Sequence, residues 1–191
     1  MPSRSLPATL VSTILICAGM ASSQEISLDL DPAKTTIQFT LPGTVHTVHG
    51  SFKLKRGSIR FDPATGKIGG EAVVDATSGE SGSDGRDRRM HAGILESARY
   101  PEIVFTPDRV AGSVAKQGDS QVEVHGMFRI HGAEHEVTLP VHVQMTQMAD
   151  GRALATIHFT IPYVKWGLKN PSTLFLRVSD KVDIDIAAYT R

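Results

Sequence analysis

The strongest constraint on the fold is an alternation of apolar and polar residues with a period of two. In the clearest run, Val124 and Phe128 alternate with Glu123 and Met127. The same pattern occurs at 36–41, 45–54, 58–61, 121–130, 136–143, 157–161 and 182–186. Successive side chains of a strand point to opposite faces, so each segment predicts a strand with one apolar and one wet face. Turn-forming residues at 62–66, 131–133 and 149–151 predict hairpins between strands.

About eight antiparallel strands must hide their edges, and the simplest solutions are a closed barrel or a two-sheet sandwich. An eight-stranded barrel has an interior that is either filled by side chains or holds one small ligand. The spacing of Met90, Ile94 and Leu95 predicts one short helix within 84–95, and 163–173 is a second irregular stretch. The sequence therefore predicts a single all-β domain with one short helix.

Residues 1–23 have the features of a secretory signal peptide. Arg4 is the only charge, residues 10–20 are apolar or small, and small residues follow at the expected cleavage positions. The apolar run is shorter than the ~20 residues that a stable membrane span requires. We therefore expect export to the periplasm or the medium, with a mature domain at 24–191. Cys17, the only cysteine, would leave with the signal peptide, so no disulfide is expected.

The composition narrows the classes of partner. Twenty basic residues balance twenty acidic ones, whereas nucleic-acid-binding proteins usually carry a basic excess, so no nucleic acid is expected. A hydrophobic content of 40% is too high for a disordered chain. The oligomeric state, monomer or homodimer, is left open by the sequence.

Short motifs follow one another in a recognisable order over most of the mature chain. They are Ile37-Gln38-Phe39, Val48-His49-Gly50-Ser51-Phe52, Gly57-Ser58-Ile59-Arg60-Phe61-Asp62, Arg86-Asp87, Tyr100-Pro101-Glu102-Ile103-Val104-Phe105, Val124-His125-Gly126-Met127-Phe128, Trp166-Gly167 and Val178-Ser179-Asp180-Lys181-Val182. In this order they resemble the YceI-like lipid/polyisoprenoid-binding family. The resemblance implies an extended, lipocalin-like antiparallel barrel with a hydrophobic pore for a polyprenyl chain or another long-chain amphiphile. It implies no cofactor and no established catalysis.

The apolar strand faces supply the candidate lining of such a pore, although the same side chains would also suit a filled core. They are Ile37, Phe39, Phe52, Leu54, Phe105, Val124, Phe128, Ile130, Val137, Leu139, Ile157, Phe159, Val182, Ile184 and Ile186. Candidates for a polar rim are Arg86 and His91 of the predicted helix and Tyr163, Lys165 and Trp166 of the irregular stretch. Arg88 and Arg89 are expected on a solvated helix face.

In the resemblance, Tyr163, Lys165 and Leu41-Pro42-Gly43 stand where the family usually has other residue types, so head-group contacts at these positions are not carried over. Eight histidines keep an alternative open, a His-dependent metal-binding protein or a lipid hydrolase with His91 or His135 as its base. The spacing of His131 and His135 matches no established zinc pattern.

A two-residue turn at Gly132-Ala133 would pair Ile130 with His135 and point the imidazoles of His131 and His135 to opposite faces. The sequence also contains no GxSxG, HExxH or phosphate-binding loop. Asp87, His91 and Ser97 do not have a spacing that identifies a triad. We therefore expect a binding protein and not an enzyme.

Overall fold

A computed structural model describes residues 25–115, 117–147, 152–173 and 176–191. The predicted signal peptide and the predicted turn at 149–151 lie outside the described residues, and both stay predictions. The described strands are β1 (Ile26–Asp29), β2 (Thr36–Leu41), β3 (Val48–Asp62), β4 (Lys67–Glu80), β5 (Glu102–Ala111), β6 (Gly118–Ile130), β7 (Ala133–Gln147), β8 (Arg152–Ile161) and β9 (Val182–Tyr189). Between β4 and β5, helix α1 (Asp84–Arg89) continues into a π-helical turn, Met90–Ile94.

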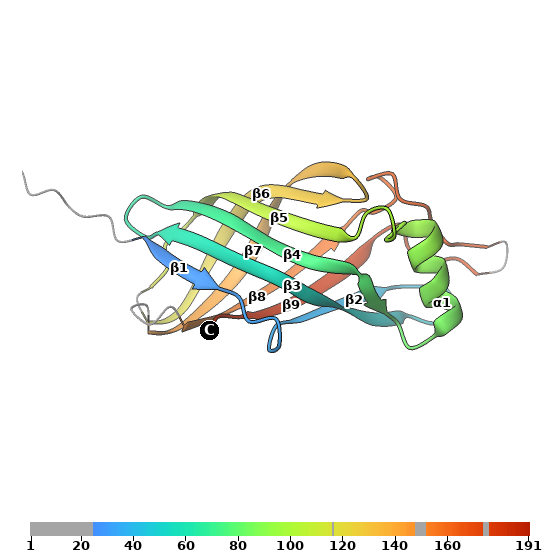
Figure 1. Cartoon of the computed structure of the whole chain (residues 1–191), viewed down its shortest axis with the longest axis horizontal. Coiled ribbons are helices and arrows are strands. Elements are labelled where there is room, and N and C mark those ends of the chain that lie inside the picture. Colours follow the sequence, from blue (N-terminus) through green and yellow to red (C-terminus); the bar gives the residue numbers. More distant parts are fainter. Residues whose placement is uncertain (1–24, 116, 148–151, 174–175) are drawn as a thin grey trace, which may run out of the picture.

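All the strands belong to one antiparallel sheet that closes on itself (Figure 1). One edge of β3 pairs first with β2 and then with β1, and its other edge pairs with β4, which closes a ring of β2 to β9. Strand β1 is an extra, short strand outside this ring. Closure leaves no unpaired edge in the ring, which removes the aggregation hazard of an open sheet. The predicted all-β antiparallel barrel with one short helix is confirmed.

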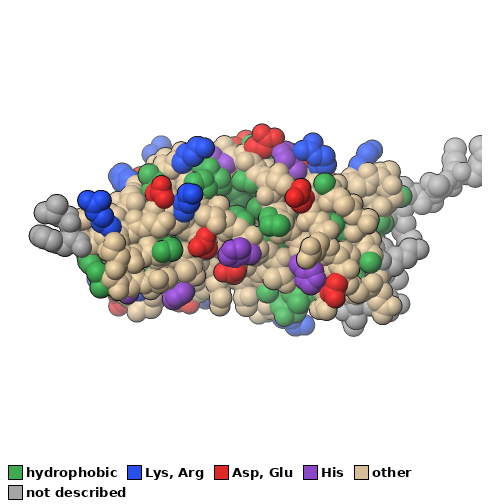
Figure 2. Space-filling model, turned by 180° about the vertical axis from the view of Figure 1, so that it is seen from behind, with side chains coloured by type: hydrophobic (Ala, Val, Ile, Leu, Met, Phe, Trp, Pro, Cys, Tyr) green, Lys and Arg blue, Asp and Glu red, His purple; other side chains and the backbone are tan. Residues whose placement is uncertain are grey.

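The register of the strand pairs places the predicted apolar side chains in the interior of the barrel. Val124 lies opposite Leu139 and Val122 opposite Val141 on the paired strands β6 and β7. Opposite residues of an antiparallel pair share a face, and all four side chains are buried in one cluster. The sheet in turn presents its polar residues outward, where acidic, basic and histidine side chains are interspersed (Figure 2).

The segments 45–54 and 58–61, read as two strands from their alternation, are one bent strand. Leu54 and Ile59 both face the interior, although their spacing of five would place them on opposite faces of a regular strand. The pairing with β4 shifts register between Leu54 and Arg56, and the irregularity restores the inward face beyond it. The alternating pattern did not predict strands β4 and β5, because similar register shifts and runs such as Val73-Val74 interrupt their period of two.

The predicted turn at Gly132-Ala133 is wrong by one residue. Ile130 pairs with Ala133 and Phe128 with His135, so the two turn residues are His131 and Gly132. Both have positive φ, 53° and 76°, as a type I′ hairpin turn requires. The correction changes the cross-strand partner of His135 from Ile130 to Phe128, and His135 stays on the inward face that both partners share.

The two ends of the barrel differ. Helix α1 and the segments 162–173 and 176–181 lie at one end, here called the helix end, and β1 and the C-terminus lie at the other (Figure 1). None of the helices in the described residues is long and apolar enough to cross a membrane.

Candidate functional site

The interior of the barrel contains a cavity of about 210 Å³, here called the deep cavity. All nine described strands contribute to its lining, which is aliphatic or aromatic except for Thr35 and Thr190. Both hydroxyl oxygens accept backbone N–H groups, from Tyr189 and Ala153 respectively. Nine of the predicted lining residues are found here: Ile37, Leu54, Phe105, Val124, Phe128, Leu139, Ile157, Phe159 and Ile186.

A second cavity of about 150 Å³, the helix-end cavity, continues from the deep cavity. Six side chains line both cavities and form a waist between them: Ile37, Val74, Ile103, Phe128, Phe159 and Ile186. The predicted residues Phe39, Phe52, Ile130, Val182 and Ile184 line the helix-end cavity. Val137 lines neither cavity, but packs against the buried clusters around both.

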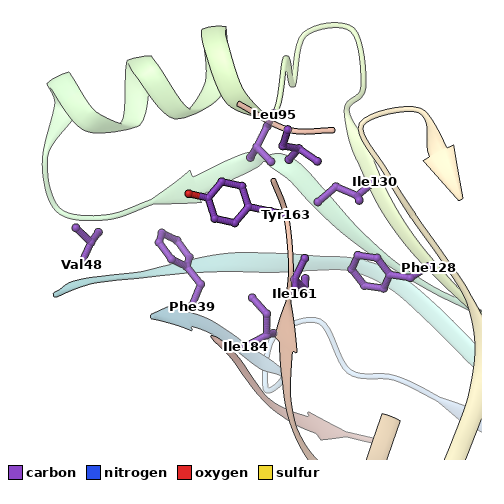
Figure 3. Close-up of a cluster of buried hydrophobic side chains, with 9 residues drawn as sticks. Phe39, Val48, Leu95, Phe128, Ile130, Ile161, Tyr163 and Ile184 are labelled. Carbon is purple, nitrogen blue, oxygen red and sulfur yellow. The ribbon is translucent and has the colours of Figure 1, made fainter. Parts of the chain in front are cut away.

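Helix-end side chains converge on one apolar cluster (Figure 3). Phe39 comes from β2, Phe128 from β6 and Leu95 from the segment after the helix. The ring of Tyr163 lies among them and is only 6% exposed, so it is not part of a polar rim. Its hydroxyl donates a hydrogen bond to the Ser179 carbonyl at 2.7 Å. Burial, with a smaller contribution from Asp180, raises the pKa of Tyr163 to about 12, so the phenol stays neutral.

The third hollow, of about 290 Å³, opens outside the helix-end cavity and is here called the mouth. Its walls are residues of the segment 43–48, the helical residues Arg86, Arg89, Met90 and Ile94, and residues of the described parts of the stretch before β9, 171–173 and 176–178. It shares five apolar side chains with the helix-end cavity: Phe39, Leu41, Met90, Ile94 and Pro171. The mouth, the helix-end cavity and the deep cavity therefore adjoin one another in a row, and their combined volume falls in the range of about 300–1,000 Å³ typical of ligand pockets.

Of the polar candidates on the helix, Arg86 lines the mouth and His91 does not. Both ring nitrogens of His91 have partners, Ser97 Oγ at 2.9 Å and the Gly79 carbonyl at 2.8 Å. The Ser97 side chain is buried and lines none of the three cavities, and Asp87 bonds Ser81 instead of His91. The Ser–His pair thus anchors the helical segment to β4, and among the described residues no carboxylate is hydrogen-bonded to His91.

Trp166 and His135 form a stacked pair at the helix end. Their ring centroids are 4.1 Å apart with an interplanar angle of 4°, and Trp166 also lies 5.7 Å from the ring of Phe128. His135 Nε2 is buried and has no hydrogen-bond partner among the described residues. Burial lowers the pKa of His135 below its ordinary value, because the charged imidazolium would lose its solvation there.

We expect His135 and His125 to titrate on opposite sides of pH 6.5. His125 lies between Asp108 and Glu136, at 2.7 and 2.8 Å, and the hydrogen bonds to these carboxylates raise its pKa above 6.5. The lowered pKa of His135 means that the unfolded chain binds this proton more readily than the folded one. Its contribution to stability is therefore complete above pH 6.5 and declines as the pH falls through 6.5 toward the folded pKa.

An NMR titration of the imidazole resonances measures both values. A midpoint for His135 at or above 6.5 would contradict the buried stack. In the His135→Phe variant, the free energy of unfolding should fall less as the pH drops below 6.5, because this imidazole is no longer there to titrate. The His125→Gln variant should retain the contribution of His135.

The metal-binding alternative finds no geometric support within the part of the chain that the structure describes. No three His, Cys, Asp or Glu side chains come together there in a group that could hold a metal ion. His131 lies against Tyr100 and faces Glu96 at 3.5 Å, while His135 stacks on Trp166. Both ring nitrogens of His91 are hydrogen-bonded, to Ser97 and to the Gly79 carbonyl.

Sequence reasoning missed part of the mouth. Arg89, expected on a solvated helix face, is exposed but also lines the hollow, together with Arg177 and His46. The spacing of Met90 and Ile94 predicted only a helix, but both side chains line the helix-end cavity and the mouth. Nothing in the local sequence indicates that 43–48, 86–94 and 171–178 meet.

Comparisons with known proteins agree with the geometry. A crystal structure of Burkholderia cenocepacia BcnA is similar with a TM-score of 0.72 and 19% identity, covering 85% of this chain and 100% of that one. A polyisoprenoid binding domain from Saccharophagus degradans gives 0.63 and 18%, covering 87% and 98%. A Campylobacter jejuni YCEI protein gives 0.55 and 14%, covering 100% and 99%. At these identities the likeness is one of fold.

The comparison with curated proteins gives no match. The model of the YceI-like domain matches residues 28–189, which is nearly all of the predicted mature chain. This range contains every strand of the closed ring and the helix that borders the mouth. The chain therefore belongs to the YceI-like family.

Proposed function

We propose that the protein binds one long-chain amphiphile of the isoprenoid type, a polyprenyl derivative or an isoprenoid quinone, and carries or sequesters it. The tail would occupy the deep cavity and the helix-end cavity, and the head would lie in the mouth. The observation that carries this proposal is the row of adjoining hollows, with largely apolar linings, that runs from the mouth into the barrel interior. The fold likeness to a polyisoprenoid binding domain supports it.

The energetics favour such a ligand without hydrogen bonds to its tail. Burial of one methylene contributes about 0.8 kcal/mol, so a five-carbon isoprene unit contributes about 3–4 kcal/mol. A few buried units exceed the cost of association and still give micromolar or tighter binding. An aliphatic and aromatic lining is sufficient for this purpose.

Binding, and not catalysis, is the function proposed. The residues nearest to a catalytic pair, His91 and Ser97, are committed to structural hydrogen bonds away from the cavities. Export is proposed with it, on the strength of the signal-peptide features at 1–23. An exported barrel of this kind would hold an apolar compound in the aqueous space outside the inner membrane.

Native mass spectrometry of the protein purified from a periplasm, followed by solvent extraction, tests the proposal. We expect an organic adduct of several hundred daltons that leaves in solvent and has the mass of an isoprenoid. An unliganded mass, together with failure to bind added geranylgeraniol, geranylgeranyl phosphate, phytol and phytanic acid, would contradict it. A mass increment removed by a chelator would instead favour the metal alternative.

A further inference from the structure

The mouth of the barrel joins an apolar floor to a wall that carries three arginines. Phe39, Leu41 and Met90 belong to the floor that continues into the helix-end cavity. Arg86 and Arg89 belong to helix α1, and Arg177 lies in the segment before β9. The imidazole of His46 also lines the mouth. Among the described residues that line the mouth there is no Asp or Glu.

Arg89 and Arg177 are distinguished by their position at the rim of an apolar hollow. On the outside of the barrel, Arg56 binds Glu71 and Glu102, and Lys55 also binds Glu102. The guanidinium groups of Arg89 and Arg177 form no ion pair or side-chain hydrogen bond within the described parts of the chain, as is also true of other exposed arginines such as Arg60. Both groups are therefore available to an anion that binds in the hollow, beside the apolar floor.

Arg86 is held in place at the same wall. Its Nε donates to Ser81 Oγ at 2.7 Å and its Nη2 donates to the Ser81 carbonyl at 2.8 Å. Ser81 is in turn bonded to Asp87, so the side chain of Arg86 is fixed by its own helix and the end of β4. These bonds leave Nη1 of a positioned guanidinium free to donate.

We propose that the head group bound in the mouth is anionic, a phosphate or a carboxylate held by Arg89 and Arg177 beside the fixed Arg86. Guanidinium groups bind both kinds of oxyanion through charge-assisted, often bidentate, hydrogen bonds. The adjoining apolar floor would receive the first carbons of the tail. The proposal rests on the proposed tail-binding function and specifies its ligand class as acidic amphiphiles, excluding neutral alcohols, amides and quinones as preferred ligands.

Matched twenty-carbon isoprenoids test the charge of the head. Geranylgeranyl phosphate is compared with geranylgeraniol, and phytanic acid with phytol, by titration of the full mature protein. We expect each anion to bind at least about tenfold more tightly than its alcohol at low salt, since hydrogen bonds to charged groups are stronger than neutral ones. The phosphate and carboxylate arms show which anion is preferred. The advantage should shrink in high salt, because the mouth is solvent-exposed.

The double variant Arg89→Gln/Arg177→Gln should lose about tenfold in affinity for the anions and leave the alcohols unchanged. Arg60→Gln, an exposed position on the outside of β3, is the matched control and should change neither. Both substituted arginines are exposed, and a thermal melt checks that the variant is folded.

Equal affinity for anion and alcohol, or an equal loss of both in the double variant, would overturn the anionic head group while leaving tail binding intact. Failure of all four compounds to bind the wild-type protein would overturn the proposed tail-binding function itself, and the anionic head group with it.

Discussion

Replacing Ala155 with phenylalanine is expected to reduce the affinity for a long-chain isoprenoid by at least about 100-fold, because each excluded isoprene unit removes about 3–4 kcal/mol of burial. Ala155 lies on the inner face of β8 and lines the deep cavity. A cavity of about 150 Å³ holds one benzene molecule, so an added phenyl ring would fill much of the 210 Å³ available. Titration with geranylgeraniol or geranylgeranyl phosphate measures the loss.

The neighbouring Thr156 provides the matched control. It is exposed on the outer face of the same strand, so Thr156→Phe adds the same ring without entering the cavity, and it should bind as the wild type does. If Ala155→Phe fails to fold, Ala188→Phe blocks the same cavity from β9. Unchanged affinity in a folded occluding variant would show that the tail lies elsewhere.

The Gly50→Ala variant should lower the free energy of unfolding by about 3 kcal/mol, or roughly 6–12 °C in Tm for a domain of this size. A Cβ at Gly50 would lie 2.3 Å from the Glu80 carbonyl oxygen and 2.3 Å from Cζ of Phe39. The carbonyl belongs to the backbone of β4 and cannot move cheaply. Relief of the clash would also displace Phe39 from the helix-end cavity and the mouth, both of which it lines.

The matched control is Gly69→Ala. A Cβ there would meet nothing within 4 Å, so this substitution should leave Tm unchanged or raise it slightly, because alanine loses less backbone entropy on folding than glycine. Thermal unfolding followed by circular dichroism compares the two variants. A melting temperature for Gly50→Ala within a degree of that of Gly69→Ala would contradict the close approach of β2, β3 and β4 at this point.

Alternation by itself predicted the inward side chains well. Phe39, Val124, Leu139 and Ile184 were assigned to the apolar face from their period of two, and all four are buried. The assignment succeeds because a strand with one wet face must segregate its side chains, whatever the partner strands are. The same pattern did not predict β4 or the bend in β3, because register shifts there interrupt the period of two.

The hairpin at 131–132 shows how a small error in a turn changes the neighbours of a side chain. Displacing the turn by one residue changes the partner of His135 from Ile130 to Phe128. Both partners face inward, so the imidazole is on the inner face in either register, and in the structure it stacks on Trp166. Both Gly132-Ala133 and His131-Gly132 are plausible two-residue turns by sequence. The packing of Tyr100 against His131 and Gly132 exists only after folding.

The sequence by itself determined a single antiparallel β domain, its inward residues and its family, because these depend on local periodicity and on motifs that are contiguous in the chain. The tertiary structure decided that the sheet closes into a barrel, that its interior retains connected cavities, and that three separate segments form the mouth. Cavity volume depends on how side chains from nine strands pack together, and the meeting of Arg86, Arg89 and Arg177 depends on loop paths. Neither is encoded by nearest neighbours along the chain.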